Sequence, residues 1–177
     1  MVLVTRNRGW FAVGAEEISK PMNLGAILRT AHAFGASYAF TVNAEHKVRE
    51  VALADTSKSA ENIPCFAYET VEELTLPAGC SLVGVELTPD AIALPTFRHP
   101  RAAAYVLGRE KGSLSEAMQA RCDFIVKIPT RFCVNVSVAC AIVLYDRSLA
   151  MGGWPERPLM PGGPELGAPE TWARVRG

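Results

Sequence analysis

Residues 128–146 read IPTRFCVNVSVACAIVLYD, and this stretch decides the fold class. It begins as the end of an apolar strand, passes through a short loop and becomes a helix near Asn135, whose side chain suits an N-cap. The expected helix, Val136 to Met151, is apolar around most of its circumference. Such a helix is buried on more than one side, so it must pack against a sheet and something else, such as a second subunit.

Short runs rich in β-branched and aromatic residues recur outside this stretch, and segments with helical patterns separate them. This alternation predicts an α/β fold, with a mainly parallel six-stranded sheet and helices on both faces. The expected strands are residues 10–15, 38–43, 64–68, 81–86, 103–108 and 123–129.

The first helix is the best defined, because residues 24–34 place apolar side chains at helical spacing. Asn23 suits its N-cap and Gly35 its C′ position. Arg29 falls outside the apolar stripe, so we expect it to face solvent. Residues 70–73 read T-x-x-E, a capping box that predicts a second, short helix.

Length and composition indicate one domain with a core. The chain has 177 residues, of which 49% are hydrophobic and 20% charged, which excludes a disordered chain. We expect residues 1–151 to form the domain and residues 152–177, rich in Pro and Gly, to form a tail. The longest apolar run, 138–145, is too short to cross a bilayer. The N-terminus has no signal-peptide pattern, which predicts a cytoplasmic protein.

Charge and cysteine content narrow the possible partners. Lys plus Arg equals Asp plus Glu at 18 each, but residues 51–100 carry a net charge of −5, whereas residues 1–50 and 101–150 are net positive. A polyanion should therefore meet the first and third stretches. The five cysteines are an odd count without a CxxC pair, so we expect buried thiols, no disulfide and no metal site.

Three segments that follow expected strands are candidates for chemistry, because ligands of parallel sheets bind at the carboxyl ends of strands. They are KPMNLGAILRTAHAFGA (20–36), VLGREKGSLS (106–115) and the opening stretch 128–146. Each has a plain structural alternative when taken alone: a capped helix with a surface arginine, a tight strand-to-helix turn, and a buried helix with an Asn cap.

Taken together and in this order, the three segments resemble the SpoU-type RNA 2′-O-ribose methyltransferases of the SPOUT class. That family carries N-x-G-x-x-x-R-T-A-x-x-F-G, then G-x-E-x-x-G-x-S, then I-P…L-N-V-S-x-A…L-Y-[DE]. The matching residues are Asn23, Gly25, Arg29, Thr30, Ala31, Phe34, Gly35, Gly108, Glu110, Ile128, Pro129, Asn135, Val136, Ser137, Ala139, Leu144, Tyr145 and Asp146.

The resemblance implies a C-terminal deep trefoil knot, an S-adenosylmethionine site built from the knotted loops, and a homodimer with the last helix in its interface. It implies catalytic roles for Arg29, Asn23, Glu110 and Asn135, with Glu110 orienting Arg29 through a charged pair. An arginine is a poor proton acceptor, so we expect Arg29 to clamp phosphate and stabilise an alkoxide. The expected cofactor contacts are Leu87, Gly108, Ile128 and Cys133. For Glu86 and Thr88, a structural role is as good an interpretation as a role in the site.

The implied activity is S-adenosylmethionine-dependent 2′-O-methylation of RNA. We expect transfer RNA rather than ribosomal RNA, because the sequence shows no additional RNA-binding domain. The alternative is a non-catalytic RNA-binding protein that retains the knotted fold. It arises because Cys133-Val134-Asn135 stands where the family commonly has Ser-Leu-Asn, in a shorter loop. Binding of S-adenosylmethionine would separate the two hypotheses.

Overall fold

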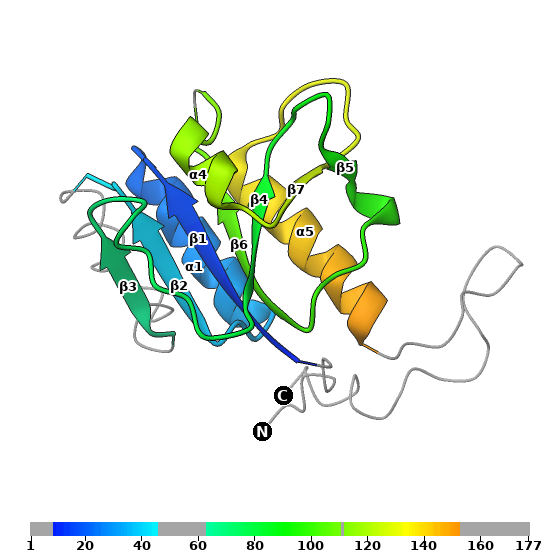
Figure 1. The fold of residues 1–177 in the computed structure, drawn as a ribbon, viewed down its shortest axis with the longest axis horizontal. Coiled ribbons are helices and arrows are strands. Elements are labelled where there is room, and N and C mark those ends of the chain that lie inside the picture. The colour runs from blue at the N-terminus through cyan, green and yellow to red at the C-terminus, as the bar shows by residue number, and fades with distance from the viewer. Residues whose placement is uncertain (1–8, 46–62, 111, 153–177) are drawn as a thin grey trace, which may run out of the picture.

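The computed structural model describes residues 9–45, 63–110 and 112–152, which form one parallel sheet covered on both faces (Figure 1). The order of its seven strands is β3-β2-β1-β6-β4-β7-β5, and every pairing is parallel. The strands are β1 (Trp10–Glu16), β2 (Tyr38–Val42), β3 (Cys65–Tyr68), β4 (Ser81–Val85), β5 (Ile92–Ala93), β6 (Ala102–Leu107) and β7 (Phe124–Lys127). The helices are α1 (Pro21–Ala33), α4 (Glu116–Arg121) and α5 (Val136–Met151), with a 3₁₀ helix at Leu94–Thr96.

The predicted α/β class and parallel sheet are confirmed, but the prediction of six strands is wrong. The seventh strand, β5, pairs with β7 through Ile92 and Val126 and through Ala93 and Lys127. Two residues are too few to produce a recognisable alternation, so the sequence pattern did not reveal this strand. All six predicted strands are present.

Two cores lie on opposite faces of the sheet, because successive side chains of a strand point to opposite sides. Phe11 and Val13 of β1 belong to the core under α1 and α5, which pack against each other. Ala12, between them, belongs to the second core, which contains Met118 of α4 and Leu74. No helix of the described residues is long and apolar enough to span a membrane.

The start of α1 differs from the prediction. Its N-cap is Lys20 and Pro21 occupies the first turn, so Asn23 lies inside the helix and is not its cap. Proline is well suited to that position because the first helical N–H groups have no partner within the helix. Gly35 follows the C-cap with a φ of +78°, as the sequence predicts.

The predicted capping box at Thr70 forms only in part, because Glu73 binds the Glu69 amide, and the predicted helix is not present. Thr70 Oγ1 accepts a hydrogen bond from the Glu73 amide at 3.3 Å, and Glu73 Oε2 accepts one from the Glu69 amide at 2.9 Å. The chain nevertheless makes only a turn over residues 71–73. Pro77 follows so closely that no second helical turn fits before it.

The last helix, α5, has the predicted bounds and the predicted cap, since Asn135 Oδ1 accepts a hydrogen bond from the Ser137 amide at 2.8 Å. Arg147, within this apolar helix, is completely buried. Its guanidinium donates to the carbonyl oxygens of Trp10, Pro100 and Arg101. These bonds fix the C-terminal half of α5 to the strand edge opposite the candidate site. The predicted tail lies outside the described residues except for residue 152.

Candidate functional site

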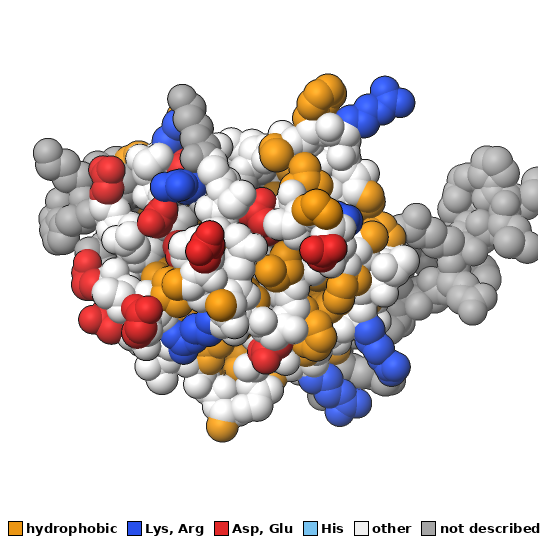
Figure 2. All heavy atoms as spheres, turned by 45° about the horizontal axis from the view of Figure 1, so that its top comes forward, with side chains coloured by type: hydrophobic (Ala, Val, Ile, Leu, Met, Phe, Trp, Pro, Cys, Tyr) orange, Lys and Arg blue, Asp and Glu red, His pale blue; other side chains and the backbone are white. Residues whose placement is uncertain are grey.

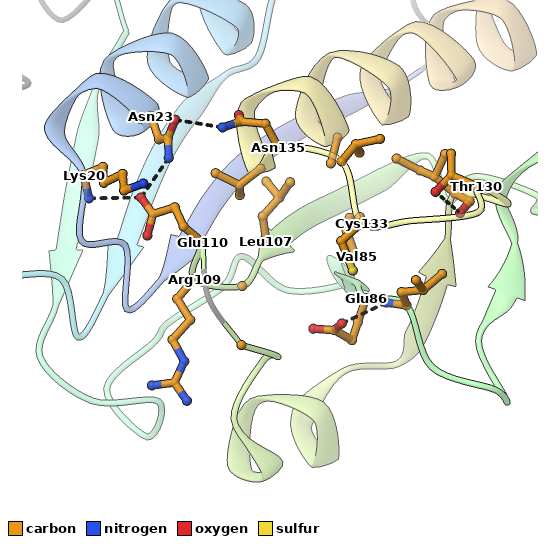
Figure 3. Close-up of a pocket in the computed structure, with 17 residues that line it drawn as sticks. Lys20, Asn23, Val85, Glu86, Leu107, Arg109, Glu110, Thr130, Cys133 and Asn135 are labelled. Atoms are coloured by element: carbon orange, nitrogen blue, oxygen red, sulfur yellow. Dashed lines mark hydrogen bonds between the residues drawn. The ribbon is translucent and has the colours of Figure 1, made fainter.

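A cavity of about 300 Å³ lies at the carboxyl ends of β4, β6 and β7, beside the first turns of α1 and α5 (Figure 3). The three segments singled out in the sequence meet here, and residues 85–87 add a fourth wall. The lining residues are Lys20, Asn23, Val85, Glu86, Leu87, Leu107, Gly108, Arg109, Glu110, Gly112, Ile128, Thr130, Cys133, Val134, Asn135, Val136 and Ala139.

Glu110 is the centre of a hydrogen-bond cluster at one end of the cavity. Its Oε2 accepts bonds from the amide and hydroxyl of Ser19 at 3.1 and 2.8 Å. Its Oε1 accepts bonds from the Lys20 amide at 3.0 Å and from Asn23 Nδ2 at 2.9 Å. Burial by itself raises the pKa of Glu110, but hydrogen bonds from Asn23, its own amide and Ser19 outweigh burial and lower this pKa to about 2.

Asn23 links this cluster to the last helix. While Asn23 Nδ2 donates to Glu110, Asn23 Oδ1 accepts a hydrogen bond from Asn135 Nδ2 at 3.2 Å. Asn135 Oδ1 in turn accepts bonds from the amide and hydroxyl of Ser137 at 2.8 and 2.6 Å. One chain of hydrogen bonds therefore joins α1, the loop after β6 and the start of α5.

Arg29 stands apart from the other predicted catalytic residues. It is exposed on α1, as predicted, and does not line the cavity. At 1.5 Å per residue it lies about 9 Å along the helix from Asn23. The predicted pair between Glu110 and Arg29 is wrong, because both carboxylate oxygens of Glu110 bind donors from residues 19–23. The start of α1 brings those donors to Glu110, whereas the exposed guanidinium lies further along the helix.

The four residues predicted to contact a cofactor, Leu87, Gly108, Ile128 and Cys133, all line the cavity. At Gly108 an added Cβ would lie 3.0 Å from the Leu114 amide nitrogen, so a side chain would push the following loop away. The glycine therefore allows the backbone of residues 113–114 to lie close to the end of β6.

Two further acidic residues lie at this edge: Glu86, whose role the sequence left open, and Glu17, which the sequence analysis did not single out. Glu86 lines the cavity and accepts hydrogen bonds from the amides of Leu87 and Leu114, each at 2.8 Å. Glu17 forms an ion pair of 2.8 Å with Arg109 at the cavity rim. Both follow the ends of strands, which is the signal in the sequence that would have found them.

Among the described residues, no three His, Cys, Asp or Glu side chains are grouped so that they could hold a metal ion. All five cysteines are free thiols, but the prediction that they are buried holds only for Cys140. Cys65 and Cys133 are exposed because they lie on the edge strand β3 and in the loop before α5.

Known proteins resemble this chain in both sequence and fold. The chain is 34% identical over 142 residues to the 23S rRNA (guanosine-2′-O-)-methyltransferase of Nitrosomonas europaea, covering 73% of this chain and 52% of that protein. It is 25% identical to the tRNA (guanosine(18)-2′-O)-methyltransferase of Escherichia coli, covering 81% and 65%. The crystal structure of an rRNA methyltransferase from Sinorhizobium meliloti superposes with a TM-score of 0.71 at 22% identity, covering 82% of this chain and 57% of that one.

The chain thus spans little more than half the length of the relative from Nitrosomonas europaea. The sequence model of the SpoU rRNA Methylase family matches residues 11–145, which include the whole cavity lining and all the strands except Trp10 of β1. The chain belongs to the SpoU rRNA methylase family.

Proposed function

We propose that this protein is an S-adenosylmethionine-dependent RNA 2′-O-ribose methyltransferase. The observation that carries the proposal is the hydrogen-bonded series Glu110, Asn23 and Asn135, which joins the three family motifs at one end of a single cavity. The names of the curated relatives, which are rRNA and tRNA 2′-O-methyltransferases, support the same reaction. Transfer RNA remains the expected substrate and ribosomal RNA the alternative.

The cavity has the size and chemistry that the cofactor requires. Its volume lies in the range of small-molecule sites, and its walls combine apolar side chains with backbone polar groups. Leu87, Ile128 and Val134 offer apolar surface for the adenine ring, and Gly108 keeps the loop backbone close. When bound, S-adenosylmethionine supplies the electrophilic methyl group.

Glu110 positions its neighbours and is not the general base. A base that removes a proton works best with a pKa near the operating pH, whereas the pKa of Glu110 is about 2. Both of its oxygens are also occupied by donors from residues 19–23. We assign it to holding Asn23, so that Asn23 and Asn135 are fixed where the ribose enters.

Arg29 is assigned to the RNA backbone. Its exposure leaves the planar guanidinium free to bind a phosphate with two parallel hydrogen bonds. Seen from the carboxyl ends of the strands, acidic side chains gather over the β2 and β3 half and apolar ones over the β4 and β7 half (Figure 2). RNA is a polyanion and is repelled by the acidic half, so it should approach another surface of the molecule. We assign that role to the surface of α1 that carries Arg29.

A homodimer through α5 is part of the proposal. Val138, Ile142, Tyr145 and Leu149 lie at helical spacing on α5 and keep exposed or half-exposed side chains. Met22 on the adjoining α1 is 81% exposed. A continuous apolar stripe of this kind is typical of a surface that a second copy covers.

The trefoil knot and the cytoplasmic location also remain proposals. The segment after β7 must pass over the ends of β4 and β6 to reach α5, which packs on α1 at the other half of the sheet. This crossing supports the knot. A crystal structure in which the path of the backbone forms no knot would contradict this proposal. Cell fractionation would test the cytoplasmic location.

The experiment is transfer of a labelled methyl group from S-adenosylmethionine to unmodified transfer and ribosomal RNA. We expect label in RNA with the wild type and none with Asn135→Ala, which breaks the series at its last member. If the wild type does not bind the cofactor and does not transfer label, the proposal fails. The non-catalytic alternative predicts RNA binding without cofactor binding, which titration with S-adenosylmethionine would reveal.

A further inference from the structure

Glu86 is a carboxylate at the far end of the cavity from Asn23, Glu110 and Asn135 (Figure 3). It directly follows β4, and its side chain is partly buried. Within the described part of the chain it forms no ion pair with a Lys or Arg. The only hydrogen-bond partners of its carboxylate there are the amides of Leu87 and Leu114. It therefore places a negative charge in the cavity wall that only backbone groups partly neutralise.

The carboxylate of Glu86 still has acceptor capacity. An ionised carboxylate offers about four lone-pair sites on two oxygens. Leu87 N–H binds Oε1 and Leu114 N–H binds Oε2, so each oxygen keeps a free site. Two neighbouring acceptors match a pair of adjacent hydroxyl donors, and a carboxylate that follows a strand of a parallel sheet is well suited to ribose hydroxyls.

The two ends of the cavity indicate which part of a cofactor meets Glu86. The methyl group must be presented to RNA, and the residues assigned to the ribose of RNA, Asn23 and Asn135, lie at the opposite end. The nucleoside part then extends away from them, toward Glu86. We propose that Glu86 binds the ribose hydroxyls of S-adenosylmethionine; this assignment rests on the proposed function and names a cofactor contact within it.

A purely structural role is the competing interpretation. The bond from the Leu114 amide ties the loop after β6 to the end of β4, and this tie exists without any ligand. A structural residue would affect all ligands through the shape of the cavity. A ribose-binding residue would affect only ligands that carry the hydroxyls, so the two roles differ in their ligand dependence.

The test is isothermal titration calorimetry of the wild type and Glu86→Gln with S-adenosylmethionine, 5′-methylthioadenosine and 2′-deoxy-5′-methylthioadenosine. Gln keeps one acceptor for the backbone amides but removes the charge. We expect Glu86→Gln to bind the first two ligands about tenfold more weakly, because hydrogen bonds to a charged acceptor are about twice as strong as neutral ones. The wild type should bind the deoxy ligand more weakly than its ribose counterpart, and Glu86→Gln should reduce that difference.

The matched control is Glu116→Gln, an exposed carboxylate at the start of α4, which should leave every affinity unchanged. If the wild type does not bind S-adenosylmethionine, the proposed function itself fails. If the wild type binds S-adenosylmethionine but Glu86→Gln binds all three ligands as tightly as the wild type does, the ribose assignment is overturned and the proposed function stands. The same holds if Glu86→Gln lowers the affinity for S-adenosylmethionine alone. The wild-type comparison of the two thioadenosines keeps the test decisive even if the variant does not fold.

Discussion

Replacing Glu110 with Gln should destabilise the fold in a way that depends on pH. The carboxylate holds four donors from residues 19–23, two on each oxygen. An amide keeps one oxygen and turns an NH₂ group toward the other two donors. The first turn of α1 and the orientation of Asn23 therefore lose part of their support, which should also weaken methyl transfer.

The magnitude follows from the pKa of Glu110, which falls from the ordinary value of 4.5 to about 2 in the folded protein. That difference corresponds to about 3 kcal/mol of folding free energy at neutral pH. The side chain is partly exposed to solvent, which screens the interaction, so we expect about 1–2 kcal/mol. Because the folded pKa is the lower one, this stabilisation is complete above about pH 4.5 and disappears as the pH falls toward 2.

The assay is urea unfolding of the wild type, Glu110→Gln and the control Glu116→Gln between pH 7 and pH 3, at one protein concentration. The gap between the wild type and Glu110→Gln should be largest at pH 7 and shrink below pH 4.5. Glu116→Gln should change the free energy of unfolding by less than about 0.5 kcal/mol. Equal stability of the wild type and Glu110→Gln at pH 7, or a gap independent of pH, would refute the reasoning.

Four further changes have distinct outcomes. Arg29→Ala should lower the rate of methyl transfer by about 10²- to 10³-fold without changing affinity for S-adenosylmethionine. Arg29→Lys should not restore the rate, because a point charge cannot form the two parallel hydrogen bonds of a guanidinium to phosphate. Joint loss of cofactor binding and melting temperature would indicate a structural role. Val138→Glu should convert the dimer to the 19.1 kDa monomer in sedimentation, whereas a monomeric wild type would contradict the proposed interface. Arg147→Met should lower the free energy of unfolding by about 3 kcal/mol, because three carbonyl oxygens each lose the hydrogen bond from the guanidinium, while exposed Arg131→Met should not. Deleting the residues after Gly153 should leave the melting temperature unchanged, since a segment rich in Pro and Gly offers few ladder or core contacts; a large drop would show that the tail packs on the domain.

The parts of the fold that the sequence predicts are those with a strong local pattern. The bounds of α5 follow from its apolar run and from Asn135, whose short side chain reaches the amide two residues on. The parallel sheet follows from strongly apolar strands separated by helical segments. The two-residue β5 has no such pattern, and its pairing with β7 is a tertiary contact.

The site shows the same division between local and tertiary information. Local sequence made Asn23 the expected helix cap, although Pro21 nearby indicates that the helix begins earlier. Its actual partners, Glu110 and Asn135, are distant in sequence, and only the fold brings them together. Arg147 is a charged residue that would ordinarily face solvent, yet both of its terminal NH₂ groups donate to carbonyl oxygens at the start of the strands in the core.

The central claim is that methyl transfer occurs on the 2′-oxygen of an RNA ribose. The most direct test is mass spectrometry of nucleosides from transfer and ribosomal RNA incubated with the protein and S-adenosylmethionine that carries a labelled methyl group. We predict that the label appears in a 2′-O-methylated nucleoside and is lost with Asn135→Ala. Label on a base, or no label from a protein that binds the cofactor, would contradict the claim.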